Sequence, residues 1–501
     1  MIYDSNVAII EEDQNSGAAR PYLPWRDIIL WSFLAGGLPF LIYLRTLAPT
    51  VYGLDSAELS TGAYMLGIVH APGSPTYLLI GHLFTKLPFG DVGYRLNLLS
   101  ACAVTVALIF MFHIAWQLTQ QKLLSLLSTW WLAFTYYVWI AAVAAELYAL
   151  QGMFTAVLLW LALQWQPPKK RWPLPLFAFC YGLGLGVHLS LALLLPGFLI
   201  LLWSVQRPWQ DVKSWAFAFL AGSLGLLVYL YLPLRSAATI PFNQSLSSPV
   251  DLTTWDGFWW MVTARMFAPL FFGVPPEMLS GELATYLFRL WSNFLGIGLL
   301  MGLWGMVHDW RKRPYWHTGL LLMLVVYLFF YFTYRAGDKE LMFLPTYLIG
   351  GVWLALGVNA LFQWQPIKSL PPWSRFIPLM LLMSGTLLTN YQFADVSDDW
   401  SARDLGERIL AKLEPNAVYM GTWADVPILQ YLQVVEGYRP DVVIDFINPN
   451  NIEYIVETSL ASALPVYVTT RGHISPERYN FQRLDVCNCY QVNYGASSEA
   501  K

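Results

Sequence analysis

The sequence predicts a polytopic α-helical membrane protein that ends in a small α/β domain, and two observations support this. Apolar residues make up 56% of the 501 residues and charged residues only 12%, about half the usual ~25%. A soluble domain with so little charge could not cover its core. Charge is also unevenly distributed, because residues 392–501 hold 8 of the 29 Lys and Arg residues and 15 of the 32 Asp and Glu residues.

A transmembrane helix needs about 20 apolar residues. Eleven stretches approach this length, and we expect one span near each: 27–47, 94–117, 123–143, 146–165, 173–188, 189–205, 214–234, 283–307, 316–334, 341–362 and 376–391. The short fifth and sixth spans are expected to be tilted or joined by a tight turn at His188. Residues 1–26 are polar and lack the apolar core of a signal peptide, so we expect a disordered cytoplasmic tail.

The loops indicate how the chain is oriented, because Lys and Arg in short loops remain in the cytoplasm. One set of alternate loops contains Lys122, Lys169, Lys170, Arg171, Arg207, Lys213, Arg311, Lys312, Arg313, Lys368 and Arg375. We therefore expect a cytoplasmic N-terminus and, after eleven spans, residues 392–501 outside. The N-terminus, which lacks a signal peptide pattern, favours a bacterial plasma membrane as the location.

The outer domain alternates predicted helices and strands. We expect helices at 400–413, 424–435 and 450–462, and extended segments at 416–421, 441–446 and 465–469. This alternation predicts a small parallel α/β sheet. The first strand is not followed by a glycine-rich phosphate loop, so nucleotide binding is not expected there.

Two further classes are not supported. The chain is nowhere basic enough for a nucleic-acid partner, and four cysteines are too few for a disulfide framework. Cys102 and Cys180 lie in apolar stretches and are expected to pack there. Cys487 and Cys489 form a C-x-C without a second metal-spaced pair, so we expect no zinc site and assign them no role.

Most of the chemical information is in the first outer loop, residues 48–93. Asp55 and Glu58 are three residues apart and would share one face of a helix. Two carboxylates at a membrane surface suit general-base chemistry or metal binding. They equally suit a capping box, with Asp55 as N-cap and Glu58 as its partner. The spacing leaves both interpretations open.

The same loop contains a histidine in a rigid turn. His70 is followed by A-P-G-S-P, and two prolines around a glycine favour a fixed turn that ends the preceding helix. Residues 75–89 are apolar but too short to span, and they predict an interfacial helix. Arg95 and Asn97 then open the second span at the outer boundary.

Residues 53–101 resemble the pattern D-S-x-E, L-G-x-x-H-x-P-G-x-P-x-Y, L-P-x-G and R-x-N-L-L-S-A. This pattern marks a family of polytopic proteins related to protein O-mannosyltransferases. The similarity continues at A-E-L-Y-A-L (145–150), G-L-G-L-G-V-H (182–188), Y-L-P-L-R-S (231–236) and G-D-K-E-L-M-F-L-P (337–345), and it covers about the first 350 residues. Ser74 stands where the pattern has an aromatic residue.

The resemblance implies a GT-C glycosyltransferase fold in residues 27–391, with outer loops 48–93 and 235–282. It also implies a polyprenyl-phosphate sugar as donor, with mannose as one candidate sugar, and a membrane-embedded lipid tail. The acceptor would be a Ser or Thr of a protein, or a cell-envelope glycan or lipid. Divalent metal dependence stays open, with Asp55 and Glu58 as its ligands if it exists.

The expected roles follow from this chemistry. Asp55 would take the proton of the acceptor hydroxyl, and Glu58 would assist by hydrogen bonding or by holding a metal. The leaving phosphate needs fixed cations, and Arg235 and Arg335 at the outer ends of two spans suit it, with Lys339 and Arg265 as reserves. The alternative for Arg335 is a structural ion pair with Asp338 or Glu340.

Further substrate-binding candidates are His70, Glu146, His188, Arg95 and Asp338. Glu146 interrupts a long apolar stretch, where an ionisable group is costly. The aromatic-rich stretch 252–272 should lie on the outer surface and border either the donor groove or only the membrane.

Two other classes remain as alternatives. A transporter or flippase of a lipid-linked or polar substrate would place paired charges at mid-span depth and would show repeats, whereas the charges here gather at the outer boundary. A structural membrane protein would have no reason to place carboxylates and arginines on one outer rim.

Overall fold

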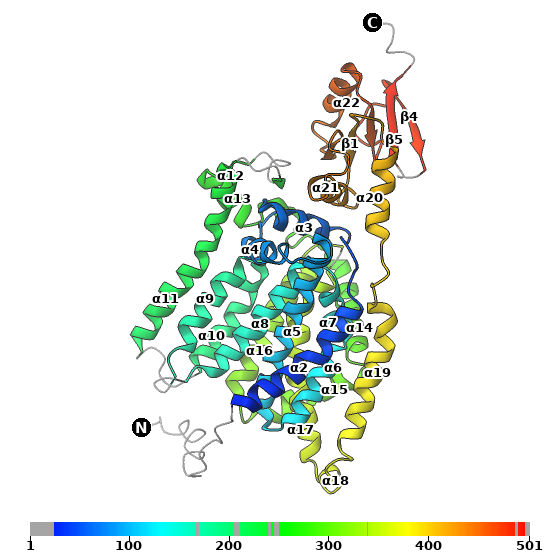
Figure 1. Cartoon of the computed structure of the whole chain (residues 1–501). Helices are drawn as coiled ribbons and strands as arrows, with labels where there is room; N and C mark the ends of the chain where they lie inside the picture. The colour runs from blue at the N-terminus through cyan, green and yellow to red at the C-terminus, as the bar shows by residue number, and fades with distance from the viewer. Residues whose placement is uncertain are drawn as a thin grey trace.

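The computed structural model describes residues 25–166, 170–204, 211–238, 242–244, 250–337, 339–485 and 489–495. A bundle of long helices carries a small α/β domain at one end, beside the first long loop of the chain (Figure 1). The predicted N-terminal tail before Trp25 lies outside the described residues, as do Asp338 and Cys487.

Within the described residues, six helical segments are long and apolar enough to cross a membrane, as expected of an integral membrane protein. They are α2 (Trp25–Arg45), α5 (Val92–Thr119), α8 (Leu147–Gln164), the run Val212–Ala237 of α11, η3 and α12, α16 (Pro314–Thr333), and Leu341–Gln363 of η7 and α17. Shorter apolar helices are α9 (Pro173–Leu185) and Leu189–Trp203 of η1 and α10, and α19 (Phe376–Ala394) leads to the α/β domain.

All eleven predicted ranges fall on helices, but two of them are not straight spans. α6 (Lys122–Ala133) meets α7 (Tyr136–Val143) at 69°, and Pro276–Asn293 of η6 and α14 meets α15 (Ile297–Trp310) at 97°. The second break contains Leu295 and Gly296, both at positive φ (53° and 65°). Composition over a window detects apolar length and cannot detect such a bend. Up to eight spans result if each bent pair crosses once, so the number eleven stays a prediction.

The first long loop forms two short helices, α3 (Asp55–Met65) and α4 (Pro75–Phe84). α4 is shorter than the expected interfacial helix 75–89, and its residues 75–78 are buried, although Leu83 is 70% exposed. Asn97 of α5 fixes the start of the loop: its amide donates to the carbonyls of Ala48 and Thr50 and accepts from the N–H of Ala145, at 2.8–2.9 Å.

The C-terminal domain contains a five-stranded sheet in the order β2-β1-β3-β5-β4. Its elements are α20 (Ser401–Lys412), β1 (Val418–Gly421), α21 (Val426–Val434), β2 (Val443–Phe446), α22 (Ile452–Ala461), β3 (Val466–Val468), β4 (Tyr479–Leu484) and β5 (Cys489–Tyr494). The three predicted strands and three predicted helices are all present, and β2, β1 and β3 are parallel.

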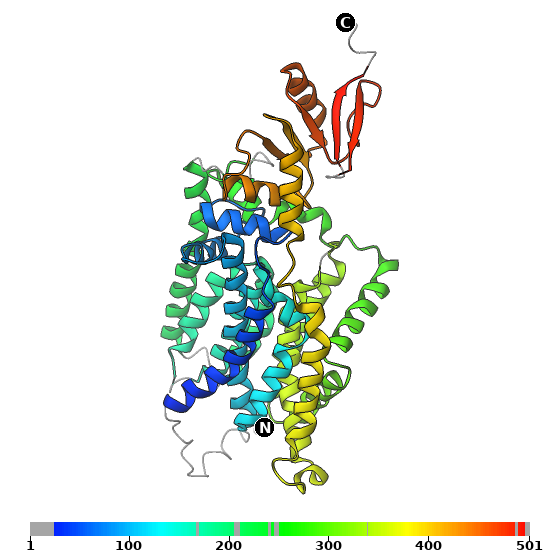
Figure 2. The same cartoon turned by 45° about the vertical axis from the view of Figure 1, so that its right-hand side comes forward.

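The sheet is nevertheless mixed and not purely parallel as predicted. The sequence patterns missed β4 and β5, which pair antiparallel with each other and extend the sheet through β3. Their sequences, YNFQRL and CYQVNY, are rich in polar residues and lack a continuous apolar run. Figure 2 shows this hairpin on the side of the domain away from the bundle. Cys489 is disulfide-bonded, while Cys102 and Cys180 are free.

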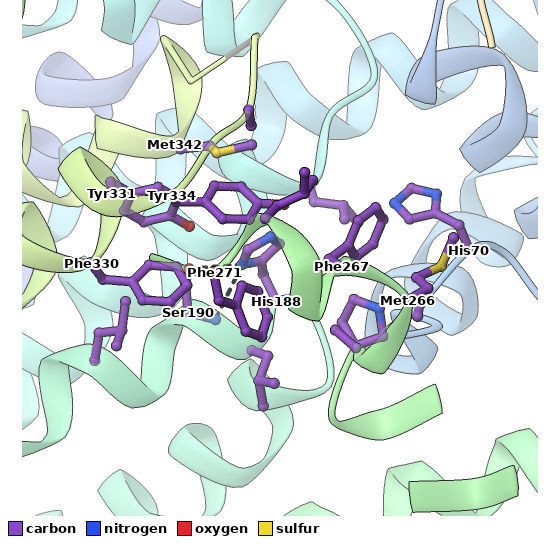
Figure 3. A pocket seen from close by; sticks show the side chains of 18 of the residues that line it. His70, His188, Ser190, Met266, Phe267, Phe271, Phe330, Tyr331, Tyr334 and Met342 are labelled. Atoms are coloured by element: carbon purple, nitrogen blue, oxygen red, sulfur yellow. Dashed lines mark hydrogen bonds between the residues drawn. The ribbon is translucent and has the colours of Figure 1, made fainter. Parts of the chain in front are cut away.

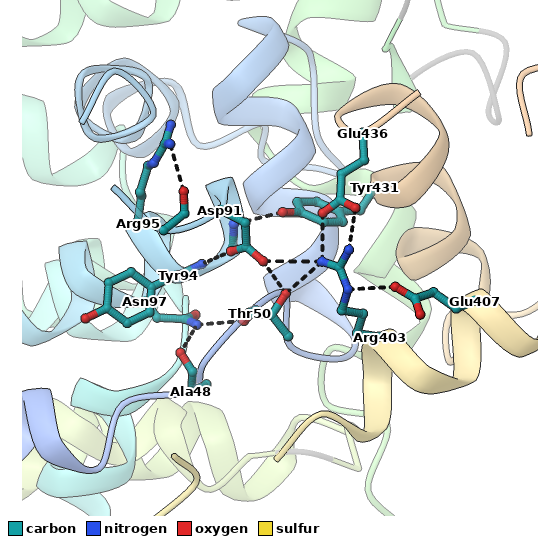
Figure 4. Close-up of polar contacts among 12 residues, drawn as sticks. Ala48, Thr50, Asp91, Tyr94, Arg95, Asn97, Arg403, Glu407, Tyr431 and Glu436 are labelled. Carbon is teal, nitrogen blue, oxygen red and sulfur yellow. Dashed lines mark hydrogen bonds and ion pairs between the residues drawn. The ribbon is translucent and has the colours of Figure 1, made fainter. Parts of the chain in front are cut away.

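The domain is held on the first loop by a charged network around Arg403 of α20 (Figure 4). Its guanidinium donates to both carboxylate oxygens of Glu436 at 2.8 and 2.6 Å and to Glu407 at 2.7 Å. It also reaches Thr50 at 3.2 Å and Asp91 at 3.3 Å, which belong to the first loop. One cation therefore joins carboxylates from both parts of the chain.

Asp91 connects this network to the bundle. Its carboxylate caps α5 by accepting the N–H of Tyr94 at 2.7 Å, and it also accepts from the hydroxyl of Thr50. Close by, the N–H of Gly93 donates to the hydroxyl of Tyr431 of α21 at 3.0 Å. Because α21 packs against α3, these contacts set the position of the domain over the first loop.

We predict that Arg403→Gln loosens this docking, because Asp91 and Glu436 lose their shared cation. Charge-assisted hydrogen bonds of this kind contribute about 1.5–3 kcal/mol, so cleavage of the linker at residues 395–400 by a broad-specificity protease should be about tenfold faster or more. Arg478→Gln is the matched control, since the described ion-pair partners of Arg478, Glu453 and Glu457, lie within the domain. Equal cleavage of the two variants would contradict the docking role.

Candidate functional site

A cavity of about 630 Å³ lies where the first loop, the bundle and the C-terminal domain meet. This volume is in the range of small-molecule sites. Five segments far apart in the sequence contribute residues to its lining. They are Asp55 and residues 70–72 of the first loop, Leu147 and Tyr148 of α8, part of 188–193 around η1, part of 263–271 around η5, and part of 330–337 with Met342, at the end of α16 and beyond it. Trp423 of the C-terminal domain completes the lining.

The cavity has one polar end and one apolar aromatic end. His70 lies at one end beside Phe267 and Met266, and Phe330 and Tyr331 lie at the other (Figure 3). Phe330, Phe271 and Tyr334 form a cluster of three rings, with all centroid distances between 5.6 and 5.8 Å. Such a wall suits an amphiphilic ligand. The stretch 252–272 thus contributes to the cavity through η5 (Arg265–Leu270).

Glu58 and His70 form the tightest polar contact of the site. Glu58 is fully buried, and it accepts the backbone N–H of His70 at 2.7 Å and ring Nδ1 at 2.5 Å. A buried carboxylate is costly unless its oxygens are paired in this way. The hydrogen bond from Nδ1 to Glu58 fixes the ring, and the other ring nitrogen, Nε2, lies 4.0 Å from an oxygen of Asp55.

His70 is a cation in this environment. Burial lowers its pKa, but the charges of Glu58 and Asp55, the hydrogen bond to Glu58 and the charge of Glu146 together raise the pKa to about 9. At neutral pH the imidazolium therefore lies between two carboxylates, those of Glu58 and Asp55.

Asp55 is the carboxylate that faces the cavity. It is the first residue of α3, its side chain is 25% exposed, and it accepts the indole N–H of Trp423 at 2.7 Å. The capping-box interpretation is wrong: the N-cap position is Leu54 without a side-chain cap, and Glu58 is occupied by His70. The two carboxylates instead flank one histidine.

Three further predicted residues lie at or near the cavity. His188 lines it, and its Nδ1 accepts the N–H of Ser190 at 3.2 Å. Arg335 lines it, and Glu340 pairs with Arg289 rather than with Arg335. Glu146 directly precedes two lining residues, and its charge contributes to the raised pKa of His70.

The other predicted cations do not line the cavity. Arg235 donates to the carbonyls of Leu66 and Met65 at 2.7 and 3.3 Å, so it holds the C-terminal end of α3. Lys339 is 5% exposed and pairs with Glu282 at 2.8 Å. Arg95 binds carbonyls of the 85–90 turn. Arg265 precedes the lining residue Met266 but is not part of the lining.

Metal binding by Asp55 and Glu58 together does not fit this arrangement. Across the part of the chain that the structure describes, no three His, Cys, Asp or Glu side chains are placed to hold an ion. The two Glu58 oxygens are both turned to His70, so the carboxylates do not converge on one point.

Sequence reasoning missed Trp423 altogether. It lies in T-W-A-D directly after β1, at the carboxyl end of a parallel strand. This edge is where α/β sheets place ligand-binding residues. The position of Trp423 after a predicted strand could therefore have marked it as a candidate ligand-binding residue. Its partner, Asp55, is 368 residues away and could not be predicted.

Comparisons with known proteins support the resemblance. A family model described as the Protein O-mannosyl-transferase TMEM260 N-terminal domain matches residues 55–212. Protein O-mannosyl-transferase TMEM260 of Mus musculus is 26% identical over 460 residues, which cover 84% of this chain and 63% of the relative. The Dictyostelium discoideum protein of the same name is 22% identical over 456 residues, covering 80% and 55%. The chain thus spans less than two thirds of the length of these relatives.

Solved structures share the fold at low identity. ArnT from Cupriavidus metallidurans bound to undecaprenyl phosphate has a TM-score of 0.58 at 11% identity, covering 95% of this chain and 99% of ArnT. Its apo structure gives 0.57 at 12% identity, covering 94% and 99%. The likeness therefore includes both the helical bundle and the C-terminal domain.

The raised pKa of His70 predicts a pH-dependent stability. An unfolded histidine titrates near 6.5, so the stabilisation from folded-state protonation is complete below about pH 6.5 and is lost as pH rises through about 9. The detergent-solubilised protein should therefore have a thermal midpoint that falls between pH 6.5 and 9. In His70→Gln, which cannot titrate, this fall should be smaller; an identical fall in both proteins would contradict the assignment.

Proposed function

We propose that this chain, a GT-C membrane protein related to the protein O-mannosyl-transferases, is an inverting glycosyltransferase that uses a polyprenyl-phosphate sugar. The observation that carries the proposal is one cavity in which the Asp55 carboxylate, the His70 cation and Arg335 share space with an apolar aromatic wall. The names of the relatives favour mannose as the sugar and a protein Ser or Thr as the acceptor, over a cell-envelope glycan or lipid.

In this proposal Asp55 is the general base. It accepts the proton of the acceptor hydroxyl while the acceptor oxygen attacks the anomeric carbon. The bond between that carbon and the phosphate oxygen breaks, and polyprenyl phosphate leaves with inversion. A positioned base of this kind contributes about 10²–10⁴ in rate. The partial exposure of Asp55 at the cavity supports this role, because an incoming hydroxyl can reach it.

Glu58 and His70 support the base without touching the reacting atoms. Glu58 fixes His70 through one hydrogen bond from the backbone N–H and one from the ring, and the fixed ring presents Nε2 to Asp55. The proposed reaction uses no metal ion, because the carboxylates of Asp55 and Glu58 do not converge on one point.

The donor would place its phosphate and its lipid in the same cavity. Arg335 is the lining arginine, and its planar guanidinium suits a phosphate. The aromatic segment around Phe271 and Phe330 would contact the first isoprenoid units. A lipid phosphate sits at the membrane boundary, so we propose that this end of the bundle and the C-terminal domain lie on the outer side.

Asp55→Asn should lower sugar transfer by at least about 10² while folding is retained, because the amide still accepts the Trp423 hydrogen bond but cannot take a proton. The measurement is sugar release from several polyprenyl-phosphate sugars by purified protein, with Asp256→Asn, an exposed carboxylate of α13 (Trp255–Val262), as control. Normal turnover by Asp55→Asn would reject it as the base. Absence of release by the folded wild type with every donor and acceptor tried would favour the transporter alternative.

Arg335→Gln and Arg235→Gln should separate donor binding from structure. Loss of a charge-assisted phosphate contact costs about 1.5–3 kcal/mol, so Arg335→Gln should weaken donor-lipid binding at least about tenfold. Arg235→Gln removes the cap of α3 and should lower the thermal midpoint instead. Donor affinity and melting of both variants would be measured in the same detergent; unchanged affinity in Arg335→Gln would remove it from the site.

A further inference from the structure

We infer that the C-terminal α/β domain completes the catalytic site, with Trp423 as a positioning residue for Asp55. The inference rests on the proposed function, since it concerns the residue assigned there as the base. It assigns the domain a part in the chemistry itself, in addition to any part in acceptor binding.

The contact is direct and specific. The indole N–H of Trp423 donates to one oxygen of Asp55 at 2.7 Å, and the other oxygen faces Nε2 of His70 at 4.0 Å. Asp55 begins α3 directly after Gly53 and Leu54, and a Cβ at Gly53 would meet no atom within 4 Å. Side-chain contacts therefore fix the carboxylate, and Trp423 supplies its one short hydrogen bond among those described.

Trp423 is itself held rigidly. The turn that carries it is closed by Asp425, which is 7% exposed and accepts from the N–H and hydroxyl of Thr422 at 2.9 and 2.7 Å. The hydroxyl of Tyr419 donates to the same carboxylate at 2.5 Å. Phe446 stacks on the indole with centroids 5.2 Å apart and planes 19° apart. A donor held in this way keeps its direction during a reaction.

The indole also contributes to the environment of His70. The rings of Trp423 and His70 meet edge to face at 5.2 Å, and Phe267 meets His70 in the same manner at 5.9 Å. Trp423 therefore touches both members of the Asp55–His70 pair. Moving the domain by even one side-chain length would leave Asp55 without its fixed donor and open the polar end of the cavity to water.

The position of the domain matters for the same reason. Gln430 of α21 accepts from Gln244 at 2.7 Å, and Tyr431 and Arg403 bind the first loop. These contacts flank the turn of Trp423, so the docking of the domain and the orientation of Asp55 are linked. A merely docked domain would not need a hydrogen bond to the base.

The decisive experiment removes only the indole N–H. Trp423→Phe and replacement of Trp423 by benzothienylalanine, which has the shape of tryptophan but no N–H, are compared with wild type. Trp373→Phe, at a 71% exposed tryptophan outside both the linker and the cavity lining, is the matched control. The readouts are kcat, KM for the lipid-linked sugar, the thermal midpoint, and protease cleavage of the linker at 395–400.

We expect kcat to fall about tenfold or more in both Trp423 variants, as for loss of a hydrogen bond to a charged group. The KM for the donor should stay within about twofold, and the thermal midpoint and linker cleavage of the benzothienylalanine protein should match wild type. A purely structural tryptophan would change stability and cleavage but not kcat alone. If kcat of the benzothienylalanine protein equals that of Trp373→Phe, the inference is wrong.

Asp55→Asn separates this result from failure of the proposed function. If Asp55→Asn abolishes the wild-type activity while both Trp423 variants keep an unaltered kcat, only the role of Trp423 is overturned. Full activity of Asp55→Asn overturns the assignment of the base, and the positioning role falls with it.

Discussion

The buried carboxylate of Glu58 is the constraint on which the site depends. An ionised group without solvent contact costs several kcal/mol unless its oxygens are satisfied, and His70 satisfies both with its backbone N–H and its ring. For this, the chain must reverse between Glu58 and His70. α3 therefore ends in a left-handed residue, Leu66, and the N–H of Gly67 donates back to the carbonyl of Gly62 at 2.7 Å. Once Nδ1 is fixed by Glu58, the ring has one direction left for Nε2, and that direction leads to Asp55. The geometry of the proposed base thus follows from the burial of a residue that never meets the substrate.

The cavity combines segments that are distant in sequence, and the proposed donor likewise has two kinds of surface. A lipid phosphate needs fixed charge near a water-poor apolar wall, and preorganised charge is most effective where water is excluded. The first loop supplies Asp55 and His70, while residues 263–271 and 330–337 supply the wall and Arg335. Arg335 is fixed by its own backbone, since its N–H donates to the carbonyl of Leu270 at 2.9 Å. The two apolar segments are therefore tied together at the point where the guanidinium begins.

The sequence predicted those parts of the molecule that depend on local patterns. Helical stretches, the three parallel strands and the grouping of Asp55, Glu58 and His70 in one loop are all legible within a few tens of residues. It could not assign the cations, because Arg235, Arg335 and Lys339 all lie close to the outer ends of predicted spans. Arg235 binds the carbonyls that end α3, Lys339 binds Glu282, and only Arg335 lines the cavity. That choice depends on carbonyls and carboxylates from distant segments. The capping box failed for a related reason: a local motif predicts a local partner for Glu58, whereas the partner in the fold is His70.

The C-terminal domain shows most clearly how the site depends on contacts between distant segments. Arg403 binds Asp91, Asp91 caps α5, and α5 carries Asn97, which holds the backbone at Ala48 and Thr50 before Asp55. On the other side of the same interface, Trp423 binds Asp55 itself. The carboxylate is thus held from the membrane side through the backbone and from the domain side through its oxygen. Neither part of the chain alone determines where the oxygen points. A domain that only bound an acceptor could be tethered anywhere along the rim, whereas one that orients the base must be docked at a single position, as the Arg403 and Tyr431 contacts require.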